Sequence, residues 1–479
     1  MYMNRLFFLI CLLSCLITVT ADAASQKPNV VLIMCDDLGW GDTGFNGNKI
    51  IQTPHLDKMA KAGVILKRFY AGAPVCSPTR GSCLTGRNPF RYGIVTANKG
   101  HMKAQEFTLA ELLKDHGYRT GHFGKWHLGT LTKTVRESNR GGPKNIKDFS
   151  PPWQNGFEVC FSTEAKVPTW DPMLKPAGKA PGKGWAAIEE GKPTKPYGTH
   201  YWNAAGEIVK DNLRGDDSKI IMDRALPFIE SSTKADKPFF CVIWFHTPHL
   251  PVVAGPRYRD MYQKYDLYHS NYYGCITAMD EQIGRLRAQL KQLNSAENTM
   301  LWFCSDNGPE GNARAPGSAG PFRGRKRDLF EGGIRVPALL EWPAKIRPGT
   351  ETRFPMVTSD YLPTILAAME LPVQADRPID GMNLWPVFAN KVKHRQQPIG
   401  FQFQKNAAWV TDRYKLLRKQ QRSKTEYQLF DLLADPAESK DLSKEYPELV
   451  ARYQTELERW MKSCEQSNQG RDYQTKKQP

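Results

Sequence analysis

Cys76 opens the segment with the strongest chemical signal in the chain, which extends to Arg87. Pro78 stands two positions later, and proline suits the first turn of a helix because its missing N–H is not needed there. A helix that begins here would place Cys76 at the positive end of the helix dipole, beside the guanidinium of Arg80. That environment favours an anion and a reactive side chain. A buried structural cysteine beside a surface arginine is the ordinary explanation of such a pair, but it leaves the rest of the segment unexplained.

Side chains with hard oxygen ligands form a second group. Asp36 and Asp37 stand just after one apolar run, and Asp306 and Asn307 stand just after another. Calcium takes about six to eight oxygen ligands and tolerates irregular geometry. A single Asp-Asp or Asp-Asn pair is more often part of a turn or a cap. Because both pairs follow predicted strands, a shared metal site is the competing interpretation.

Basic side chains form a third group, which consists of Lys125, His127, His249 and Lys326. Taken singly, each is ordinary: Lys326 belongs to a basic run, and a buried histidine is usually satisfied within the core. His246 is interpreted as structural. Fixed cations around a tetrahedral anion stabilise its charge without reorganisation. If the fold brings the four residues together, they form a clamp for such an anion.

Four apolar runs are predicted as strands, and they are Asn29 to Met34, Tyr118 to Phe123, Phe239 to Phe245 and Met300 to Cys304. Their apolar residues are continuous rather than alternating, which indicates strands buried on both faces, as in a parallel sheet. Ligands of such sheets bind beyond the carboxyl ends of the strands, so we expect the polar groups to meet in one place. Leu109 to His116 and Ala278 to Leu293 are predicted as connecting helices. The fold class is therefore α/β.

The character of the chain changes after about residue 375. Ala407 to Lys415 and Tyr427 to Leu432 are predicted as strands of a small antiparallel sheet, and Pro447 to Met461 as an amphipathic helix. Residues 134–200 are irregular and rich in proline, glycine and lysine. A loop of this length is predicted to be either a substrate-facing wall or a surface insertion.

In chain order, these segments resemble the type I, formylglycine-dependent sulfatase family. The cysteine signature of that family is matched by Cys76, Pro78, Arg80 and residues 84–87, with Thr79 where many members have serine. The resemblance extends from about residue 29 to about residue 460. It implies the alkaline-phosphatase-like fold, an α/β/α sandwich around a mostly parallel sheet, with a smaller C-terminal α+β subdomain that carries a short antiparallel sheet.

The other motifs are matched as well. The metal motifs correspond to residues 36–39 and 305–308, and the second signature corresponds to residues 124–129. His249 lies two residues before a proline, and Lys326 lies five residues before Glu331, as the family's sulfate-contacting histidine and second lysine do. Together they make a purely structural explanation of each residue unconvincing.

The resemblance implies that Cys76 is oxidised after synthesis to formylglycine (3-oxoalanine) by a formylglycine-generating or sulfatase-maturating enzyme. It also implies one Ca²⁺ ion per active site, with the ligands Asp36, Asp37, Asp306, Asn307 and the modified residue 76. The catalytic residues that it implies are Cys76, Arg80, Lys125, His127, His249 and Lys326.

In the implied mechanism, one hydroxyl of the hydrated aldehyde attacks sulfur and gives its proton to Asp306, while Arg80 and Lys125 hold the diol. His249 protonates the leaving alcohol, helped by Lys326. The second hydroxyl then loses its proton to His127 and expels sulfate. A serine would lack this second hydroxyl, which explains the need for an aldehyde.

The first residues have the plan of a secretory signal peptide, with Arg5 before an apolar stretch from Leu6 to Val19 and small residues after it. The stretch is short for a membrane span of about 20 residues, and it continues past Cys15, which disfavours a lipoprotein site there. We therefore expect a secreted or periplasmic protein without a stable membrane span in the mature chain. The predicted organisation is a signal peptide at 1–23, a catalytic domain at 24–375, a C-terminal subdomain at 376–464 and a disordered tail at 465–479.

The formal net charge is +17, which suggests an anionic partner for an exported protein. No nucleic-acid-binding motif is present, so a sulfated polysaccharide is the anion that we expect rather than a nucleic acid. A basic, soluble surface without a specific partner would carry the same charge. The cysteines that follow the predicted signal peptide are scattered, and their spacing indicates neither a disulfide framework nor a zinc site.

Three functions stay open. The first is a sulfatase that acts on sulfated glycans. The second is a phosphonate or phosphate ester hydrolase of the same superfamily, because an anion clamp does not distinguish sulfur from phosphorus. The third is a non-catalytic polyanion-binding protein, which would need neither the nucleophile nor the metal. The candidate sugar contacts are Lys166, Trp170 and Asp171, within Phe161 to Met173, together with His200 and Arg87.

Overall fold

The structure is a computed structural model that describes residues 27–138, 140–178, 184–189, 191–373, 376–422 and 424–473. The predicted signal peptide lies outside these residues. The main sheet has the strand order β13-β2-β12-β10-β1-β9-β4-β5-β8. In this order the strands are Thr350–Thr352, Val64–Leu66, Leu339–Glu341, Thr299–Ser305, Asn29–Cys35, Phe239–Trp244, Arg119–Lys125, Val159–Thr163 and Trp202–Asn203.

The centre of the sheet is parallel. β1 pairs with β10 and β9, and β4 pairs with β9 and β5, all in parallel register. The antiparallel pairs β10–β12, β12–β2 and β5–β8 lie towards the two edges. The predicted mostly parallel sheet is confirmed, and the four predicted strands are its central neighbours.

Strand β1 shows why a central strand of this sheet has a continuous apolar sequence. Its even-numbered residues from Val30 to Met34 pack into one core cluster, and its odd-numbered residues from Val31 to Cys35 pack into the other. Each side chain of β1 therefore needs an apolar neighbour on its own face. This is the physical reason for the absence of alternation in the sequence.

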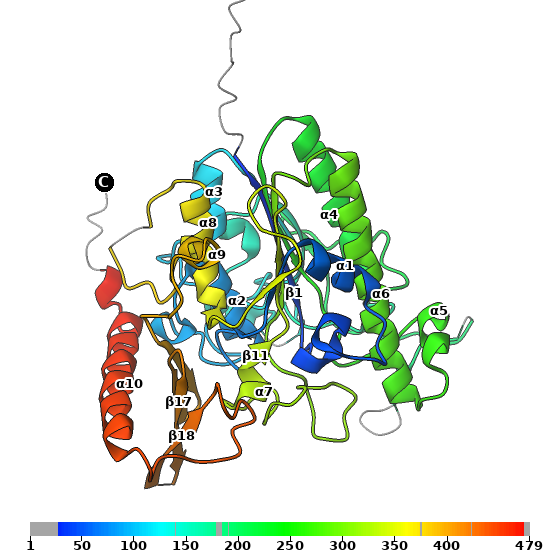
Figure 1. The fold of residues 1–479 in the computed structure, drawn as a ribbon. Coiled ribbons are helices and arrows are strands. Elements are labelled where there is room, and N and C mark those ends of the chain that lie inside the picture. Colours follow the sequence, from blue (N-terminus) through cyan, green and yellow to red (C-terminus); the bar gives the residue numbers. More distant parts are fainter. Residues whose placement is uncertain are drawn as a thin grey trace, which may run out of the picture.

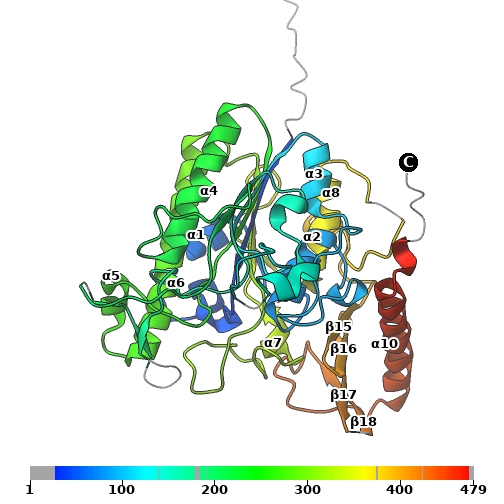
Figure 2. The ribbon, with the colours of Figure 1, turned by 180° about the vertical axis from the view of Figure 1, so that it is seen from behind.

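Helices cover both faces of the sheet (Figure 1 and Figure 2). α1 (Pro54–Ala62), α4 (Asp217–Lys234) and α6 (Leu267–Gln292) lie on one face, and α2 (Cys76–Thr85), α3 (Leu109–Asp115) and α8 (Tyr361–Ala368) lie on the other. The predicted α/β/α layers are thus present. The smaller elements are α5 (Pro256–Arg259), α7 (Glu331–Ile334), α9 (Trp385–Phe388), β3 (Phe69–Tyr70), β6 (Ala177–Gly178), β7 (Trp185–Ala186), β11 (Arg335–Val336) and β14 (Met356–Val357).

Helix α6 is longer than the sequence indicated. It was expected from Ala278 but begins at Leu267, because the carboxylate of Asp266 caps it by accepting a hydrogen bond from the N–H of His269. The first turns carry tyrosines and polar residues in place of spaced leucines, so their apolar periodicity is weak.

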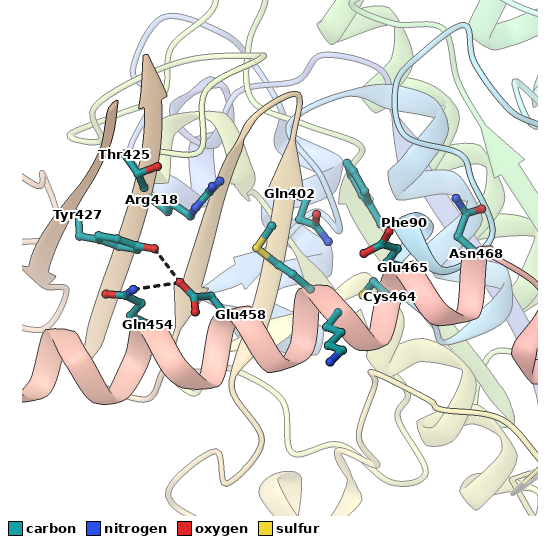
Figure 3. Close-up of a pocket in the computed structure, with 12 residues that line it drawn as sticks. Phe90, Gln402, Arg418, Thr425, Tyr427, Gln454, Glu458, Cys464, Glu465 and Asn468 are labelled. Atoms are coloured by element: carbon teal, nitrogen blue, oxygen red, sulfur yellow. Dashed lines mark hydrogen bonds between the residues drawn. The ribbon is translucent and has the colours of Figure 1, made fainter. Parts of the chain in front are cut away.

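The C-terminal part forms a four-stranded antiparallel sheet in the order β15-β16-β17-β18. The strands are Ile399–Phe403, Asn406–Val410, Tyr414–Gln421 and Lys424–Asp431, and α10 (Pro447–Asn468) packs against them. Figure 3 shows the groove between α10 and this sheet, where Glu458 accepts hydrogen bonds from Tyr427 and Gln454 at 3.2 and 3.0 Å. This groove and the phenylalanines of β15 lie on opposite faces of the sheet, since Phe401 and Phe403 belong to another core cluster.

The end of the chain corrects one prediction. Disorder was expected from residue 465, but α10 continues to Asn468 and residues Arg471–Tyr473 form a 3₁₀ turn. Asp472 pairs with buried Arg87, and the hydroxyl of Tyr473 donates to Glu106 at 2.5 Å. These two contacts hold a segment whose composition is otherwise polar. Residues 474–479 lie outside the described part of the chain.

The cysteines of the described residues are all buried thiols, and none of them is paired in a disulfide. Cys35, Cys241 and Cys304 lie in β1, β9 and β10, as small core residues. Across the same described residues, no helix has the length and apolarity that a membrane span requires.

Candidate active site

The polar groups that follow the central strands converge at one edge of the sheet. β10, β1, β9 and β4 are neighbours and run in parallel. Their carboxyl ends lead into Asp306, Asp36, His249 and Lys125. The expectation that these groups meet is confirmed, and the site lies where ligands of parallel sheets bind.

Cys76 enters this site as the first residue of α2, as the sequence predicted. Gly86 ends the helix in the left-handed conformation, with φ 67°, and its N–H donates to the carbonyl of Ser82. The Sγ atom of Cys76 lies 3.4 Å from Oδ1 of Asp36. Burial and the carboxylates of Asp306 and Asp36 raise the pKa of the Cys76 thiol. The reactive thiol suggested by the helix end is therefore not what the encoded cysteine provides.

A compact group of ligand atoms surrounds this cysteine. One atom each from Asp36, Asp37, Cys76 and His249 lies within 4.8 Å of all the others. Asp37 has a positive φ of 69°, and a carboxylate oxygen of this residue belongs to the group. Asp306 stands beside the group, and its carboxylate accepts hydrogen bonds from Arg80 and from the N–H of Asp37 at 2.7 and 3.1 Å.

The donor set fits a hard cation. Asn307 donates from Nδ2 to Asp37 at 2.7 Å, whereas its Oδ1 is buried without a hydrogen-bond partner among the described residues. An orphaned buried oxygen is costly unless something binds it. Asp36 and Asp37 add carboxylate oxygens, and oxygen is the ligand that calcium selects. Asp36, Asp37, Asp306 and Asn307 are therefore the residues that could hold the ion.

Two lysines pair with the two adjacent aspartates. Lys125 Nζ lies 2.7 Å from Asp36, and Lys326 Nζ lies 2.6 Å from Asp37 and 3.3 Å from Glu310. Burial alone would raise the pKa of Asp36, but Lys125, His249 and Arg80 hold it well below its usual range. Burial and the neighbouring Asp36 carboxylate raise the pKa of Asp306 to about 7.

Arg80 of α2 is fully buried. Its guanidinium donates to the carbonyl of Lys125 at 3.0 Å and to Asp306 at 2.7 Å, and it lies over the ring of Trp244 at 5.2 Å. These contacts fix Lys125 and Asp306 relative to Cys76. A lysine at position 80 has a single ammonium group and would not reproduce both of these guanidinium hydrogen bonds with the same geometry.

The two histidines of the set differ in their partners. His249 Nε2 lies 3.6 Å from Asp37, and its Nδ1 lies 2.7 Å from the carbonyl of Leu250. Burial lowers the pKa of His249 to about 4. His127 lies 3.4 Å from Asn98, and burial together with Lys125 lowers its pKa well below the usual value. Both rings are therefore predominantly neutral and available to exchange protons.

His246 has a structural role, as predicted. It lies between Asp217 and Thr163, at 2.8 and 2.7 Å, with no exposed surface. These two contacts fix the segment that follows β9, and His246 is not among the residues that line the pocket beside Cys76.

A cavity of about 540 Å³ opens above this group. It is lined by Val75, Cys76, Thr96, Ala97, Asn98, Lys125, His127, Lys166, His249, Leu250, Glu310, Lys326, Arg327, Phe403 and Gln404. Phe403 and Gln404 come from the end of β15 and the turn after it, so the C-terminal sheet forms part of the wall. Asn98, Glu310, Arg327 and Gln404 were not anticipated. Two of them carried a local signal, because Glu310 follows Asp306 by four residues and Arg327 is adjacent to Lys326.

Lys166 is the one candidate sugar contact that lines this cavity in the described structure. Arg87 is instead buried against Glu106 and Asp472. His200 lies 2.8 Å from Glu137. Asp171 accepts from the N–H of Gly215 at 2.7 Å, and the ring of Trp170 packs against Gly255. These four residues make contacts within the protein and do not line the cavity.

Known proteins share this arrangement. A family model described as "Sulfatase" matches residues 28–371, and one described as "N-sulphoglucosamine sulphohydrolase, C-terminal" matches residues 320–463. Steryl-sulfatase of Rattus norvegicus is 32% identical over 450 residues, which cover 82% of this chain and 76% of the relative. N-acetylgalactosamine-6-sulfatase of Canis lupus familiaris is 32% identical over 385 residues, with 76% and 67% covered.

A solved structure agrees over nearly the whole chain. The crystal structure of Ps i-CgsB in complex with k-i-k-neocarrahexaose superposes with a TM-score of 0.75 at 26% identity, and covers 94% of this chain and 97% of that one. The fold, the converging strand ends and the sequence matches agree with one another. The chain therefore belongs to the sulfatase family of the alkaline-phosphatase-like superfamily, and it is a hydrolase of sulfate esters.

Proposed function

We propose that this sulfatase releases inorganic sulfate from sulfated glycans, through a formylglycine made from Cys76 and with a bound Ca²⁺ ion. The observation that carries the proposal is the position of Cys76. It begins α2, it lines the cavity, and its Sγ lies within 4.8 Å of ligand atoms of Asp36, Asp37 and His249. A purely structural cysteine would need none of these neighbours.

The chain's own residues prepare the site for an anionic ester. When bound, Ca²⁺ supplies charge that polarises the ester and makes a nearby hydroxyl more acidic. Arg80 of α2 and Lys125 at the end of β4 place two cations beside the side chain at position 76. Lys326 offers an ammonium where negative charge develops. His249 and His127 stand on the cavity wall. His249 must first take up a proton before it can protonate the leaving alcohol, whereas neutral His127 can accept a proton from position 76.

The lining of the cavity favours a sugar over a sterol. Ten of its fifteen lining residues carry a charged, amide, imidazole or hydroxyl group, and Phe403 is its one large aromatic ring among the described residues. A sterol would need an apolar wall, whereas sugar hydroxyls match amides and charged groups. The similarity to N-acetylgalactosamine-6-sulfatase and to a protein solved with k-i-k-neocarrahexaose supports the same choice.

Export and maturation complete the proposal. The signal-peptide pattern supports a periplasmic or secreted enzyme, and formylglycine requires a formylglycine-generating or sulfatase-maturating enzyme during biosynthesis. A protein that arrives in its compartment with an unmodified thiol would then be inactive.

The test combines mass spectrometry with sulfate release. The full chain is produced with and without a co-expressed formylglycine-generating enzyme, and the peptide that contains residue 76 is weighed. We expect sulfate release to follow the fraction of formylglycine and to disappear in Cys76→Ala and Cys76→Ser. Paired sulfate and phosphate esters of one alcohol serve as substrates. Full turnover by Cys76→Ser, or faster hydrolysis of the phosphate ester, would contradict the proposal.

A further inference from the structure

The cations that line the cavity differ in whether a carboxylate already neutralises them. Lys125 is paired with Asp36 at 2.7 Å. Lys326 is paired with Asp37, and Arg327 is held by both oxygens of Glu310 at 2.7 and 2.9 Å. Within the described residues, the ammonium of Lys166 has no carboxylate within ion-pair distance.

The backbone around Lys166 is fixed, although its side chain is exposed at the rim. Its neighbours Ala165 and Val167 are buried, and its carbonyl accepts from the hydroxyl of Thr199 at 3.3 Å. Glu164, two residues earlier, receives the N–H of His127 on its carbonyl at 3.1 Å and the Nε of Arg140 on its side chain at 3.0 Å. The segment is thus attached to the strand end that carries His127.

The surroundings of Lys166 are positive as well as partly dehydrated. Burial lowers its pKa, and the ammonium groups of Lys125 and Lys326 lower it further, more than Asp36 and Asp37 offset. An ammonium group in such a field is stabilised by an anion that arrives from outside.

Lys166 is also separate from the groups that surround the scissile ester. Lys125 and Lys326 each contact an aspartate of the ligand group, whereas Lys166 contacts none of its members in the described structure. Its position at the rim places it beside the part of a substrate that extends out of the cavity.

We propose that Lys166 binds a second anionic substituent, a carboxylate or a second sulfate, on the sugar that carries the scissile sulfate or on its neighbour. This inference rests on the proposed function and narrows its substrate to a glycan with two closely spaced acidic groups. Lys166 is a specificity residue and takes no part in the bond cleavage. The amides of Asn98 and Gln404, which also line the cavity, remain for neutral hydroxyls.

The experiment compares three substrates with a common sugar backbone. One carries a single sulfate, one carries two sulfates, and one carries a sulfate beside a uronate carboxylate. Formylglycine-containing wild type is compared with Lys166→Gln, with Lys166→Arg, which keeps the charge, and with Lys175→Gln, an exposed lysine of the same insertion that does not line the cavity.

We expect wild type to favour at least one of the two doubly charged substrates by about 10-fold in kcat/KM, the size of one charge-assisted contact. Lys166→Gln should abolish this preference through KM and leave the singly sulfated substrate within about 2-fold. Lys166→Arg and Lys175→Gln should retain it. The substrate that is favoured decides between carboxylate and sulfate.

Two results would overturn the inference while sulfate release persists. One is a wild type without any preference, and the other is an equal loss on all three substrates in Lys166→Gln, which would place Lys166 on the scissile sulfate. Absence of release from every sulfate ester by wild type with confirmed formylglycine would instead overturn the proposed function, and the inference with it.

Discussion

Asp36 and Asp37 are adjacent in sequence, but they form ion pairs with lysines from different parts of the chain. Lys125 ends β4 and is fixed by the strand, while Lys326 stands on a loop and reaches Asp37 and Glu310 together. Burial opposes the charge of Lys326, yet Asp37 and the other anions raise its pKa. Lys326 is therefore charged throughout the range in which the enzyme can be assayed.

Lys326→Ala should reduce kcat/KM for a sulfate ester by about 10²- to 10³-fold, because a fixed cation is removed from the place where negative charge develops. Steady-state sulfate release in excess Ca²⁺ measures the effect. Lys345→Ala, at an exposed lysine in the next part of the chain, is the control and should retain wild-type turnover. An equally active Lys326→Ala enzyme would exclude this role.

Asp380 shows a residue-scale contact with a pH signature. It accepts from both Nε and Nη2 of Arg91, at 2.7 and 2.8 Å, and from Nε1 of Trp460 at 3.0 Å. Burial disfavours its charge, but Arg91 holds the pKa of Asp380 below its usual value. The pair thus stabilises the folded state fully above the unfolded pKa of about 3.9, and this contribution is lost as the pH falls through the lower folded pKa.

Asp380→Asn should lower the free energy of unfolding by about 3 kcal/mol at pH 7, since buried Arg91 loses its carboxylate partner. The difference from wild type should shrink as the pH falls below about 4. Urea unfolding across this range measures it, with Asp115→Asn at an exposed site as the control. A difference that stays constant with pH would show that charge is not the cause.

At the scale of elements, a buried lysine connects the C-terminal sheet to the catalytic domain. Lys415 of β17 has no exposed surface and lies 3.3 Å from Glu331 and 2.8 Å from Glu438. Glu331 begins α7, and its N–H donates to Glu438 at 2.6 Å. The N–H of Gly308, next to Asn307, donates to the carbonyl of Gly333 at 2.9 Å. The sheet therefore supports the loops that carry Lys326 and Asn307.

Lys415→Met should destabilise the protein by about 3–5 kcal/mol, because two buried carboxylates lose their shared cation. Thermal unfolding measures the loss, and turnover should fall in the same variant well below its unfolding temperature. Lys424→Met, at the exposed end of β18, should change stability by no more than about 0.5 kcal/mol. Wild-type stability in Lys415→Met would refute the support that we assign to this contact.

The sequence predicted the elements best where the local pattern is strong. The four central strands, the helix at Cys76 and the helix from Pro447 follow from apolar runs, a proline and helical spacing. The convergence of Asp36, Asp306, His249 and Lys125 could be predicted because each lies at or just after the end of a predicted strand. Parallel pairing of these strands is enough to bring the four side chains to one edge of the sheet. The start of α6 at Leu267 was missed, since a cap and aromatic packing replace apolar periodicity there.

The rest depends on partners that are distant in sequence. Arg87 was interpreted as a sugar contact, but its partner Asp472 lies 385 residues away, and no local pattern reveals such a pair. Phe403 and Gln404 join the cavity wall because the C-terminal sheet docks beside it. Tertiary packing thus brings Phe403 and Gln404 to the cavity wall, whereas the order of the strands in the sheet brings together the candidate catalytic residues at the strand ends.

For the whole molecule, the net charge of +17 is large and its effect is screened by salt. Raising NaCl from about 0.05 to about 0.5 M should lower kcat/KM for a sulfated polysaccharide more steeply than for a small monosulfate, because long-range attraction acts on the whole polyanion. Initial rates at several salt concentrations measure both slopes. Equal slopes would indicate that only the local contacts of the cavity attract the substrate.

The ion pair of Arg87 with Asp472 can form only late in synthesis of the chain. Arg87 stands just after α2, the helix that begins with Cys76, and it forms ion pairs with Asp472 and Glu106. At about 5–20 residues per second, the ribosome needs about 20–80 s to add the 385 residues that separate Arg87 from Asp472. During that interval the end of α2 lacks one of its final partners, whereas in the finished protein Cys76 is only 1% exposed. Under the proposed maturation, we therefore expect the modification of Cys76 to precede the closure of this contact between Arg87 and Asp472.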